Sequence, residues 1–235
     1  GHGGARRPYQ APVSIRIMPR ILGDAHRATS AAETIARQSL AAVSDNPVVF
    51  PAGERLGPDE VVSTGGYHNA QSASAMDALT ASYANLAVIA GRVAAKLQDG
   101  AVSLLPPFLG YQDGRSYLGC LPMAMVGYEE ELRMLAAPTL LPGSESGGFA
   151  QDDVASPVFS AWSKQERAGE LLELCLATLA PVAMRAFSVT ARPVPAALLP
   201  LAGETQACFP DDGAPNPMGE CCAGLARTFR GRIYR

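Results

Sequence analysis

The sequence predicts an all-α fold, a bundle of long central antiparallel helices with functional loops at the helix ends. Three observations predict it. Apolar residues recur at alternating steps of three and four over residues 69–99, which is the spacing of one helix face. Two further segments, 116–136 and 157–191, also have the pattern of long helices. We find no convincing run in which apolar and polar residues alternate, as half-buried strands require.

Composition limits the class of protein. With 235 residues, 48% of them apolar and 17% charged, the chain has a globular profile and the length of one domain. A net charge of −3 without a basic block argues against a nucleic-acid partner. No signal peptide is recognisable, and apolar stretches such as Ala84–Ala90 are expected to be too short and too flanked by charge to span a bilayer.

The chain has five cysteines, an odd number at irregular spacing. This pattern favours free thiols in a reducing cytoplasm over a disulfide framework or a zinc site. The three histidines lie far apart and show no ligand spacing, so no metal site is expected. The cysteines are Cys120, Cys175, Cys208, Cys221 and Cys222.

The first fifty residues divide into a tail and a helix. Residues 1–9 are rich in Gly and Arg and are expected to be flexible. A helix is predicted to begin near Pro19 or Asp24 and to end near Val43, because the Ala-rich segment up to that point has few breaking residues. Residues 44–66 are expected to form a loop or a short hairpin, because Asn-Pro and Gly punctuate them.

The helix predicted over 69–99 is the centre of the bundle. Its apolar seam persists for three heptads, so it must lie against partners along its whole length. The seam consists of Met76, Leu79, Tyr83, Leu86, Ala90, Val93 and Leu97. Small residues beside it would let neighbouring helices approach closely; they are Ala73, Thr80, Ala87 and Ala94. Gly100 is expected to cap the C-terminal end.

Two loops flank the second helix. Residues 100–114 are rich in Pro and Gly and are predicted to interrupt the helical structure. The helix that follows, over 116–136, tolerates Pro122 near its first turns. Residues 138–152 are predicted to be a Gly/Ser loop.

The third helix is predicted over 157–191, with a kink at Pro181. Its buried stripe consists of Leu171, Leu174, Leu179 and Val182. Residues 10–191 are therefore assigned to one helical domain. Residues 192–235 form a Pro- and Gly-rich tail with one possible terminal helix, near Met218–Phe229.

The first stretch with chemistry is Gln10-Ala11-Pro12-Val13-Ser14-Ile15-Arg16. The guanidinium of Arg16 is a planar, permanently charged fork that suits a carboxylate. An isolated arginine of this kind is more often solvated or paired with a surface acid. Four further motifs follow in a fixed order: Val43–Phe50 (VSDNPVVF), Thr64–His68 (TGGYH), Leu105–Leu109 (LPPFL) and Gln151–Asp153 (QDD).

In combination these motifs resemble the histidine and aromatic amino acid ammonia-lyase family, which includes the aminomutases. The resemblance runs from about Gln10 to about Val189 and is not convincing in the tail. It implies a bundle of long central helices that assembles as a tetramer, and C–N lyase chemistry on an α-amino acid. In the family, each active site draws residues from several subunits.

The resemblance also implies a prosthetic group. The family forms methylidene-imidazolone from an Ala-Ser-Gly tripeptide in its own backbone, and this group supplies the electrophile. No Ala-Ser-Gly occurs in these 235 residues, which match only the C-terminal portion of the family. Three explanations remain open. A second chain could carry the missing part, a longer chain could have been cleaved or be only partly present, or the prosthetic group could have been lost. We expect the first, a partner chain that bears the group.

The resemblance assigns five candidate substrate-binding residues. Arg16 would pair with the substrate carboxylate, and Asn46 would hydrogen-bond the same group, although an Asn before Pro is also an ordinary turn residue. Gln10 would line the pocket. Tyr67 stands where the family usually has phenylalanine, and is otherwise a core tyrosine. Asp152 stands where histidine-type lyases carry glutamate and phenylalanine-type lyases carry glutamine, and is otherwise a helix N-cap.

Two positions where the family commonly carries side chains that can transfer or accept protons hold apolar residues in this chain. Val13 occupies the position of a family tyrosine thought to assist proton transfer, and valine has no proton to move. Ala11 stands where aspartate is common. No catalytic residue can therefore be assigned. His68 is interpreted as a structural histidine.

Three functional hypotheses follow. The first is that the chain is the C-terminal-half subunit of a two-chain ammonia-lyase or aminomutase-like enzyme. The second is that it is a non-catalytic scaffold that stabilises an active partner. The third is a repurposed pocket that works without the prosthetic group. The effect of Arg16→Ala on activity separates the first two, because only the enzyme reading requires its guanidinium.

Overall fold

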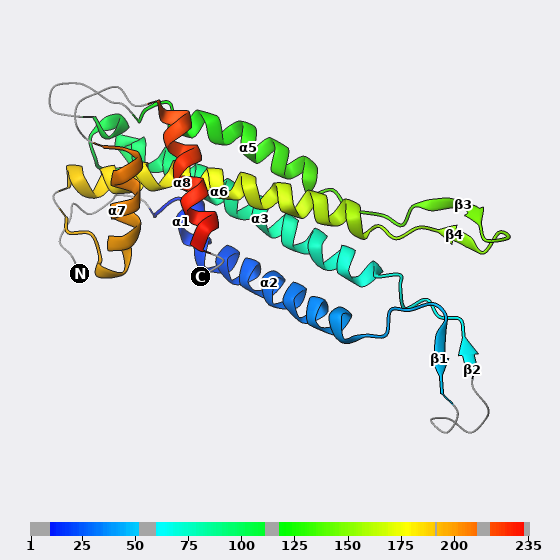
Figure 1. Ribbon diagram of the computed structural model, residues 1–235. Coiled ribbons are helices and arrows are strands. Elements are labelled where there is room, and N and C mark those ends of the chain that lie inside the picture. The colour runs from blue at the N-terminus through cyan, green and yellow to red at the C-terminus, as the bar shows by residue number, and fades with distance from the viewer. Residues whose placement is uncertain (1–9, 52–59, 111–117, 191, 211–216, 233–235) are drawn as a thin grey trace.

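The structure is a computed structural model that describes residues 10–51, 60–110, 118–190, 192–210 and 217–232. The flexible tail predicted for residues 1–9 lies outside the described residues. Four long helices run antiparallel to their neighbours and form the body of the molecule (Figure 1). They are α2 (Met18–Ala41), α3 (Ala70–Gln98), α5 (Leu121–Leu135) and α6 (Val158–Val189). The predicted all-α fold is confirmed.

Helix α3 is central, and its small residues bring the other helices close. Thr80, Ala87 and Ala94 are fully buried at 0% exposure, and Ala73 is 2% exposed. The close-approach face predicted from the sequence is therefore confirmed. The larger seam residues divide differently: Leu79 and Ala90 are buried, whereas Met76, Tyr83, Leu86, Val93 and Leu97 are only half-buried. Much of the seam is thus left partly open by this chain alone.

Helix α6 packs against α3, α5 and α8 and continues through Pro181. Leu171 and Val182 of its predicted stripe are fully buried, and Leu174 and Leu179 are half-buried. The helix ends at Val189. Pro181 is itself buried, since it lies on the face of α6 that meets the rest of the bundle.

The end of α3 differs from the prediction for Gly100. Asp99 ends α3 and at once begins α4 (Gly100–Ser103), where its Oδ1 accepts a hydrogen bond from the Ala101 amide at 3.1 Å. Gly100 is therefore the first residue of a short helix, because a carboxylate cap precedes it. The predicted interruption follows, with Leu104 in the left-handed region at φ 61° and a 3₁₀ turn at Pro107–Leu109.

Two β-ribbons extend from one end of the bundle (Figure 1). β1 (Val48–Phe50) pairs antiparallel with β2 (Glu60–Val62), as the expected short hairpin allows. β3 (Gly143–Gly147) pairs antiparallel with β4 (Asp152–Val154), where only a loop was predicted. That prediction is wrong, because positive φ values at three successive residues reverse the chain tightly enough for the flanks to pair; they are Gly148, Phe149 and Ala150.

The C-terminal segment contains two helices. The predicted terminal helix is confirmed as α8 (Met218–Arg232), and Leu225 and Cys222 on it are buried against α6 and its neighbours. Helix α7 (Leu199–Cys208) was not predicted, because it lacks a single apolar stripe. Helix α5 begins at Leu121, later than expected, with Pro122 in its first turn. The division into a domain at 10–191 and a tail at 192–235 stays a prediction.

The length argument against a membrane span must be corrected. By length and composition alone, α3 and α6 are each apolar enough to cross a bilayer. The two helices nevertheless lie against each other in the centre of the bundle, where 44% and 39% of their most apolar windows are buried. Core helices of this kind pass the same test, so the feature carries little weight.

Candidate functional site

Arg16 is the last residue of α1 (Val13–Arg16), a single turn that begins directly after Pro12. Its Nε donates a hydrogen bond to the Ala11 carbonyl oxygen at 2.9 Å, which fixes the direction of the guanidinium. Among the described residues, no hydrogen bond or ion pair involves its Nη1 or Nη2. Arg16 is exposed as a residue, and its two Nη atoms can donate parallel hydrogen bonds to a carboxylate.

Gln10 and Val13 lie on the same short segment and are both exposed. Val13 is 56% exposed. The structure places no proton donor at position 13.

Asn46 precedes β1 and is held by the end of β2. Its Oδ1 accepts hydrogen bonds from the Thr64 amide at 2.9 Å and from Ser63 Oγ at 3.2 Å. Thr64 Oγ1 in turn donates to the Asp45 carbonyl oxygen at 3.1 Å. Both acceptor lone pairs of the Asn46 amide are thereby used, and its Nδ2 has no recorded acceptor within the described ranges. The amide is oriented as a donor toward solvent.

Tyr67 and His68 follow β2, and Asp152 begins β4. Tyr67 is 53% exposed, so it is not a core tyrosine in this chain. His68 Nε2 lies 3.1 Å from the Ala155 carbonyl oxygen and donates to it in the Nε2-protonated tautomer. This contact joins the segment that carries Tyr67 to the strand that carries Asp152, and it agrees with the structural role expected of His68.

Asp152 is exposed in β4 and does not cap α6, whose first turn follows Pro157. The N-cap interpretation of Asp152 is therefore wrong. Its carboxylate lies over the tight turn of the ribbon: a Cβ at Gly148 would lie 2.8 Å from Asp152 Oδ2. Gly148 has a φ of +54°, which glycine adopts without strain.

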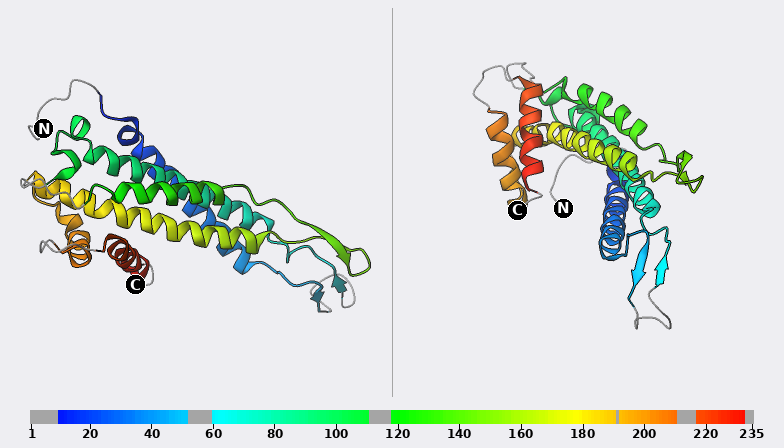
Figure 2. Two further views of the ribbon diagram at one scale, coloured as in Figure 1. Left: turned by 90° about the horizontal axis from the view of Figure 1, so that it is seen from above. Right: turned by 45° about the vertical axis from the view of Figure 1, so that its right-hand side comes forward.

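The five candidate residues do not meet within one chain. Arg16 precedes α2 and Asn46 follows it, and the 24 residues of α2 span about 36 Å. Gln10 and Arg16 lie at the α1 end, whereas Asn46, Tyr67 and Asp152 lie at the end with the ribbons (Figure 2). One chain thus presents its candidate residues in two groups at opposite ends of the bundle.

A polar cluster near the ribbon end was not found from the sequence. Asp77 of α3 accepts hydrogen bonds from the amide and Oγ1 of Thr139, and from Lys164 Nζ of α6 at 2.8 Å. Burial opposes ionisation of Asp77, but the hydrogen bonds from Lys164 and Thr139 outweigh it and lower the pKa of its carboxyl. A charged residue within the apolar α3 seam was the available signal.

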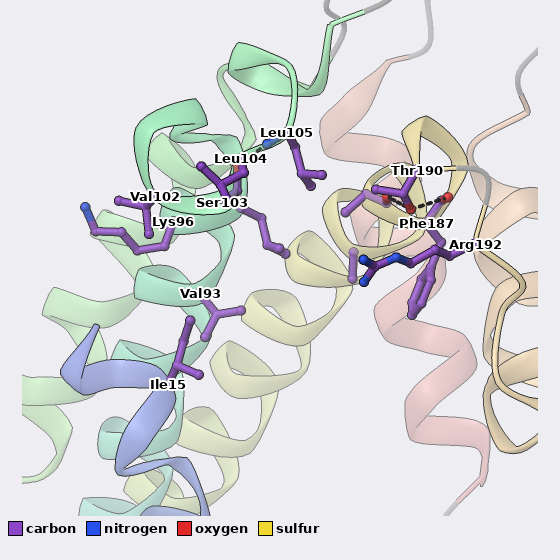
Figure 3. Close-up of a pocket in the computed structure, with 13 residues that line it drawn as sticks. Ile15, Val93, Lys96, Val102, Ser103, Leu104, Leu105, Phe187, Thr190 and Arg192 are labelled. Carbon is purple, nitrogen blue, oxygen red and sulfur yellow. Dashed lines mark hydrogen bonds between the residues drawn. The ribbon is translucent and has the colours of Figure 1, made fainter. Parts of the chain in front are cut away.

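A cavity of about 760 Å³ lies at the opposite, α1 end of the bundle (Figure 3). It is bounded by the end of α3, by α4 and by the end of α6, and Ile15 of α1 reaches its edge. None of the five candidate residues lines it. Its lining is mainly aliphatic, with the cations Lys96 and Arg192. The Lys96 ammonium lies 3.3 Å from Asp99 Oδ2, so it is already partnered.

Comparison with known proteins defines the class. A family model described as aromatic amino acid lyase matches residues 2–208. The histidine ammonia-lyase of Anaeromyxobacter sp. (strain K) is 30% identical over 183 residues, which are 77% of this chain and 35% of that protein. The chain belongs to the aromatic amino acid lyase family. The match reaches beyond the resemblance recognised from the motifs, since it includes α7.

Solved structures show the same fold. The structure of histidine ammonia-lyase from Trypanosoma cruzi superposes with a TM-score of 0.81 at 21% identity, over 94% of this chain and 43% of that one. Phenylalanine aminomutase from Pantoea agglomerans gives a TM-score of 0.83 at 20% identity, over 97% and 44%. The chain thus spans about a third of the length of the curated relatives it matches, and under half of these structures.

Proposed function

We propose that this chain is a subunit of a two-chain ammonia-lyase or aminomutase-like enzyme, and that it supplies the residues that bind the carboxylate of an α-amino acid. The observation that carries the proposal is the hydrogen bonding of the Arg16 and Asn46 side chains. Each is anchored by one edge of its polar group and offers donors on the other. A carboxylate that accepts from both would be held by charge-assisted and neutral hydrogen bonds together.

The distance between Arg16 and Asn46 requires a composite site. A two-fold axis perpendicular to the bundle would place the Arg16 end of one chain beside the Asn46 end of another, and the same operation would create a second, equivalent site. The exposed surface favours such an assembly. The chain exposes 14,922 Å², whereas a compact monomer of its mass exposes about 10,000 Å².

The prosthetic group is assigned to a partner chain. These 235 residues contain no Ala-Ser-Gly, so they cannot form methylidene-imidazolone, although Gln10 would line it beside Arg16. When bound, the group supplies the electrophile for elimination or migration of the amine. This chain's own residues bind the carboxylate at Arg16 and Asn46 and contact the substrate side chain at Tyr67 and Asp152. A proton acceptor must come from the partner, because Val13 offers none.

The exposed valine at position 13 favours a second candidate, a scaffold subunit that assembles with an active partner without taking part in its chemistry. Arg16→Ala separates the two. On the enzyme proposal, the KM for the amino acid rises about 10- to 100-fold, because a charge-assisted contact is lost. A scaffold would lose no activity from this change while the complex stays assembled.

The first experiment is the native mass of the protein purified from its own host, with an intact mass for each chain present. A co-purifying chain that contains Ala-Ser-Gly and is lighter than its sequence by two waters supports the proposal. If the peptide instead continues beyond these 235 residues into the prosthetic-group segment, the two-chain arrangement is refuted while the lyase assignment stands. If this chain assembles only with itself, the lyase assignment fails.

A further inference from the structure

Residues 139–155, here called the arm, leave the bundle after α5 and return to α6 as the β3–β4 ribbon. The arm extends well beyond the helices (Figure 1), and Phe149 at its turn is fully exposed. Asp152 lies on the returning strand. A ribbon of two short strands is marginal by itself, so the position of Asp152 depends on what holds the two ends of the arm.

The outgoing end is held by the cluster around Asp77. Thr139, the first residue of the arm, donates both its amide and its Oγ1 to the Asp77 carboxylate of α3. Lys164 Nζ of α6 joins them, since it contacts Asp77 Oδ1 at 2.8 Å, Thr139 Oγ1 at 2.7 Å and the Ala137 carbonyl oxygen. The Asp77 and Lys164 side chains are only 16% and 21% exposed, so water competes weakly for these bonds.

The returning end is held by His68. Its Nε2 lies 3.1 Å from the Ala155 carbonyl oxygen, and the Ala155 amide donates to the Pro142 carbonyl oxygen at 3.0 Å. Ala155 therefore joins the two strands of the arm and is joined to His68 at the same time. Because Tyr67 is the neighbour of His68, this contact fixes the position of Tyr67 relative to the strand of Asp152.

From these contacts we infer that Lys164, Asp77, Thr139 and His68 are positioning residues, which set where the arm presents Asp152 relative to Tyr67. None of them needs to touch the substrate. They act through the two ends of the arm, one by a partly buried ion pair and one by a single histidine hydrogen bond. The assignment of Asp152 and Tyr67 to the substrate side chain rests on the proposed function, whereas the anchoring of the arm does not.

Hydrogen exchange of the chain, in the assembly in which it is purified, tests the anchoring. Thr139→Val removes one hydroxyl and His68→Phe removes the ring nitrogens at an exposed site, so both variants are expected to fold. The backbone amides at positions 139 and 155 keep their own acceptors, Asp77 and the Pro142 carbonyl oxygen. They should nevertheless exchange about 10-fold faster, because loss of a neighbouring hydrogen bond lets the end of the arm open more often. Arg167→Met is the control, because it removes ion pairs to Glu131 and Glu170 away from the arm.

In the active complex, both variants should raise the KM about 3- to 10-fold and leave kcat within about twofold, because ground-state placement of the substrate is loosened. Unchanged exchange in the arm overturns the inference, and so does faster exchange with an unchanged KM. Failure of the proposed function has a different signature. Arg16→Ala would then leave activity unchanged, while the exchange rates would still report whether the arm is anchored.

Discussion

The carboxylate of Glu129 occupies the space in which a side chain at Gly91 would lie. A Cβ at Gly91 would be 1.9 Å from Glu129 Oε1, and Glu129 is only 6% exposed. Its Oε2 lies 3.5 Å from Arg92 Nη2. A glycine on α3 thus admits an ionisable residue of α5 into an otherwise apolar interface, where α3 and α5 are held close.

Gly91→Ala should destabilise the chain by about 1–3 kcal/mol, because the added methyl group forces the buried Glu129 carboxylate away from its place beside Arg92. Gly127→Ala on α5 is the matched control. A Cβ there meets nothing within 4 Å, so it should stabilise the helix by about 0.5–1 kcal/mol. Chemical denaturation of the two variants measures both effects. Equal changes of the same sign would show that Glu129 moves without cost.

The same carboxylate predicts a pH dependence. Burial raises the pKa of Glu129 above its usual 4.5, and Arg92 offsets this only in part. A raised folded-state pKa means that the contribution to stability is complete below the unfolded-state pKa and is lost as pH rises through the folded-state pKa. Relative to the natural chain, Glu129→Gln should therefore gain stability as pH rises above the usual carboxyl value of 4.5.

The pKa of Glu131 shifts in the opposite direction from that of Glu129, so the two carboxyls should affect stability at different pH. The hydrogen bond from Arg167 lowers the pKa of Glu131, so its contribution is present above the unfolded-state pKa and is lost as pH falls. Glu131→Gln should change the stability profile below the usual carboxyl value of 4.5, whereas Glu129→Gln should change it above that value. Urea midpoints across pH separate the two. Parallel profiles would contradict the burial argument for Glu129.

Much of the helical architecture could be predicted because it depends on local patterns. The run of small residues from Ala73 to Ala94 is visible in the sequence and is buried in the structure. The spacing of the α3 seam correctly predicts a long helix, but most of its larger side chains are only half-buried. Helix α7 was missed because it has no apolar stripe. The β3–β4 ribbon was missed because its pairing depends on left-handed conformations at Phe149 and Ala150, which side chains rarely favour.

The candidate site could be predicted as a set of residues but not as a place. The motifs give the identities of Arg16 and Asn46. Their separation follows from the unbroken length of α2. The contacts of Asp77 could not be predicted, since its partners Thr139 and Lys164 are 62 and 87 residues away in sequence. Long-range pairing of this kind follows from the packing of α3 against α6, not from any local motif.

The cysteines predict a graded reactivity. Burial raises the pKa of the Cys175 thiol to about 12, with the Glu129 charge adding to the effect. At pH 8 only about one in 10,000 of these thiols is ionised, and the thiolate is the reactive form. Cys120 is exposed. Alkylation with iodoacetamide, followed by mass spectrometry, should label Cys120 more than about 100-fold faster than Cys175. Labelling of Cys175 at a comparable rate would show that α6 opens readily.

Subunit mixing tests whether the site is composite. At substrate concentrations well below the KM, Arg16→Ala and Asn46→Ala should each leave only about 1–10% of the natural activity, because each removes one side of the carboxylate contact. If every site takes Arg16 from one chain and Asn46 from another, random mixing leaves each residue intact with a chance of one half. Both are intact at about one quarter of the sites. The two weakened preparations, denatured together and refolded with the partner, should then regain about a quarter of the natural activity under the same conditions.

The recovery depends on α2, whose 24 residues span about 36 Å and separate Arg16 from Asn46 within each chain. Were both residues of one site supplied by a single chain, every site in the mixture would contain one of the two substitutions, and no activity would return. The double variant Arg16→Ala/Asn46→Ala, mixed with the natural chain, is the control. Composite sites leave about a quarter of the activity there, whereas sites within one chain leave about half. The two mixtures together therefore decide how many chains build one site.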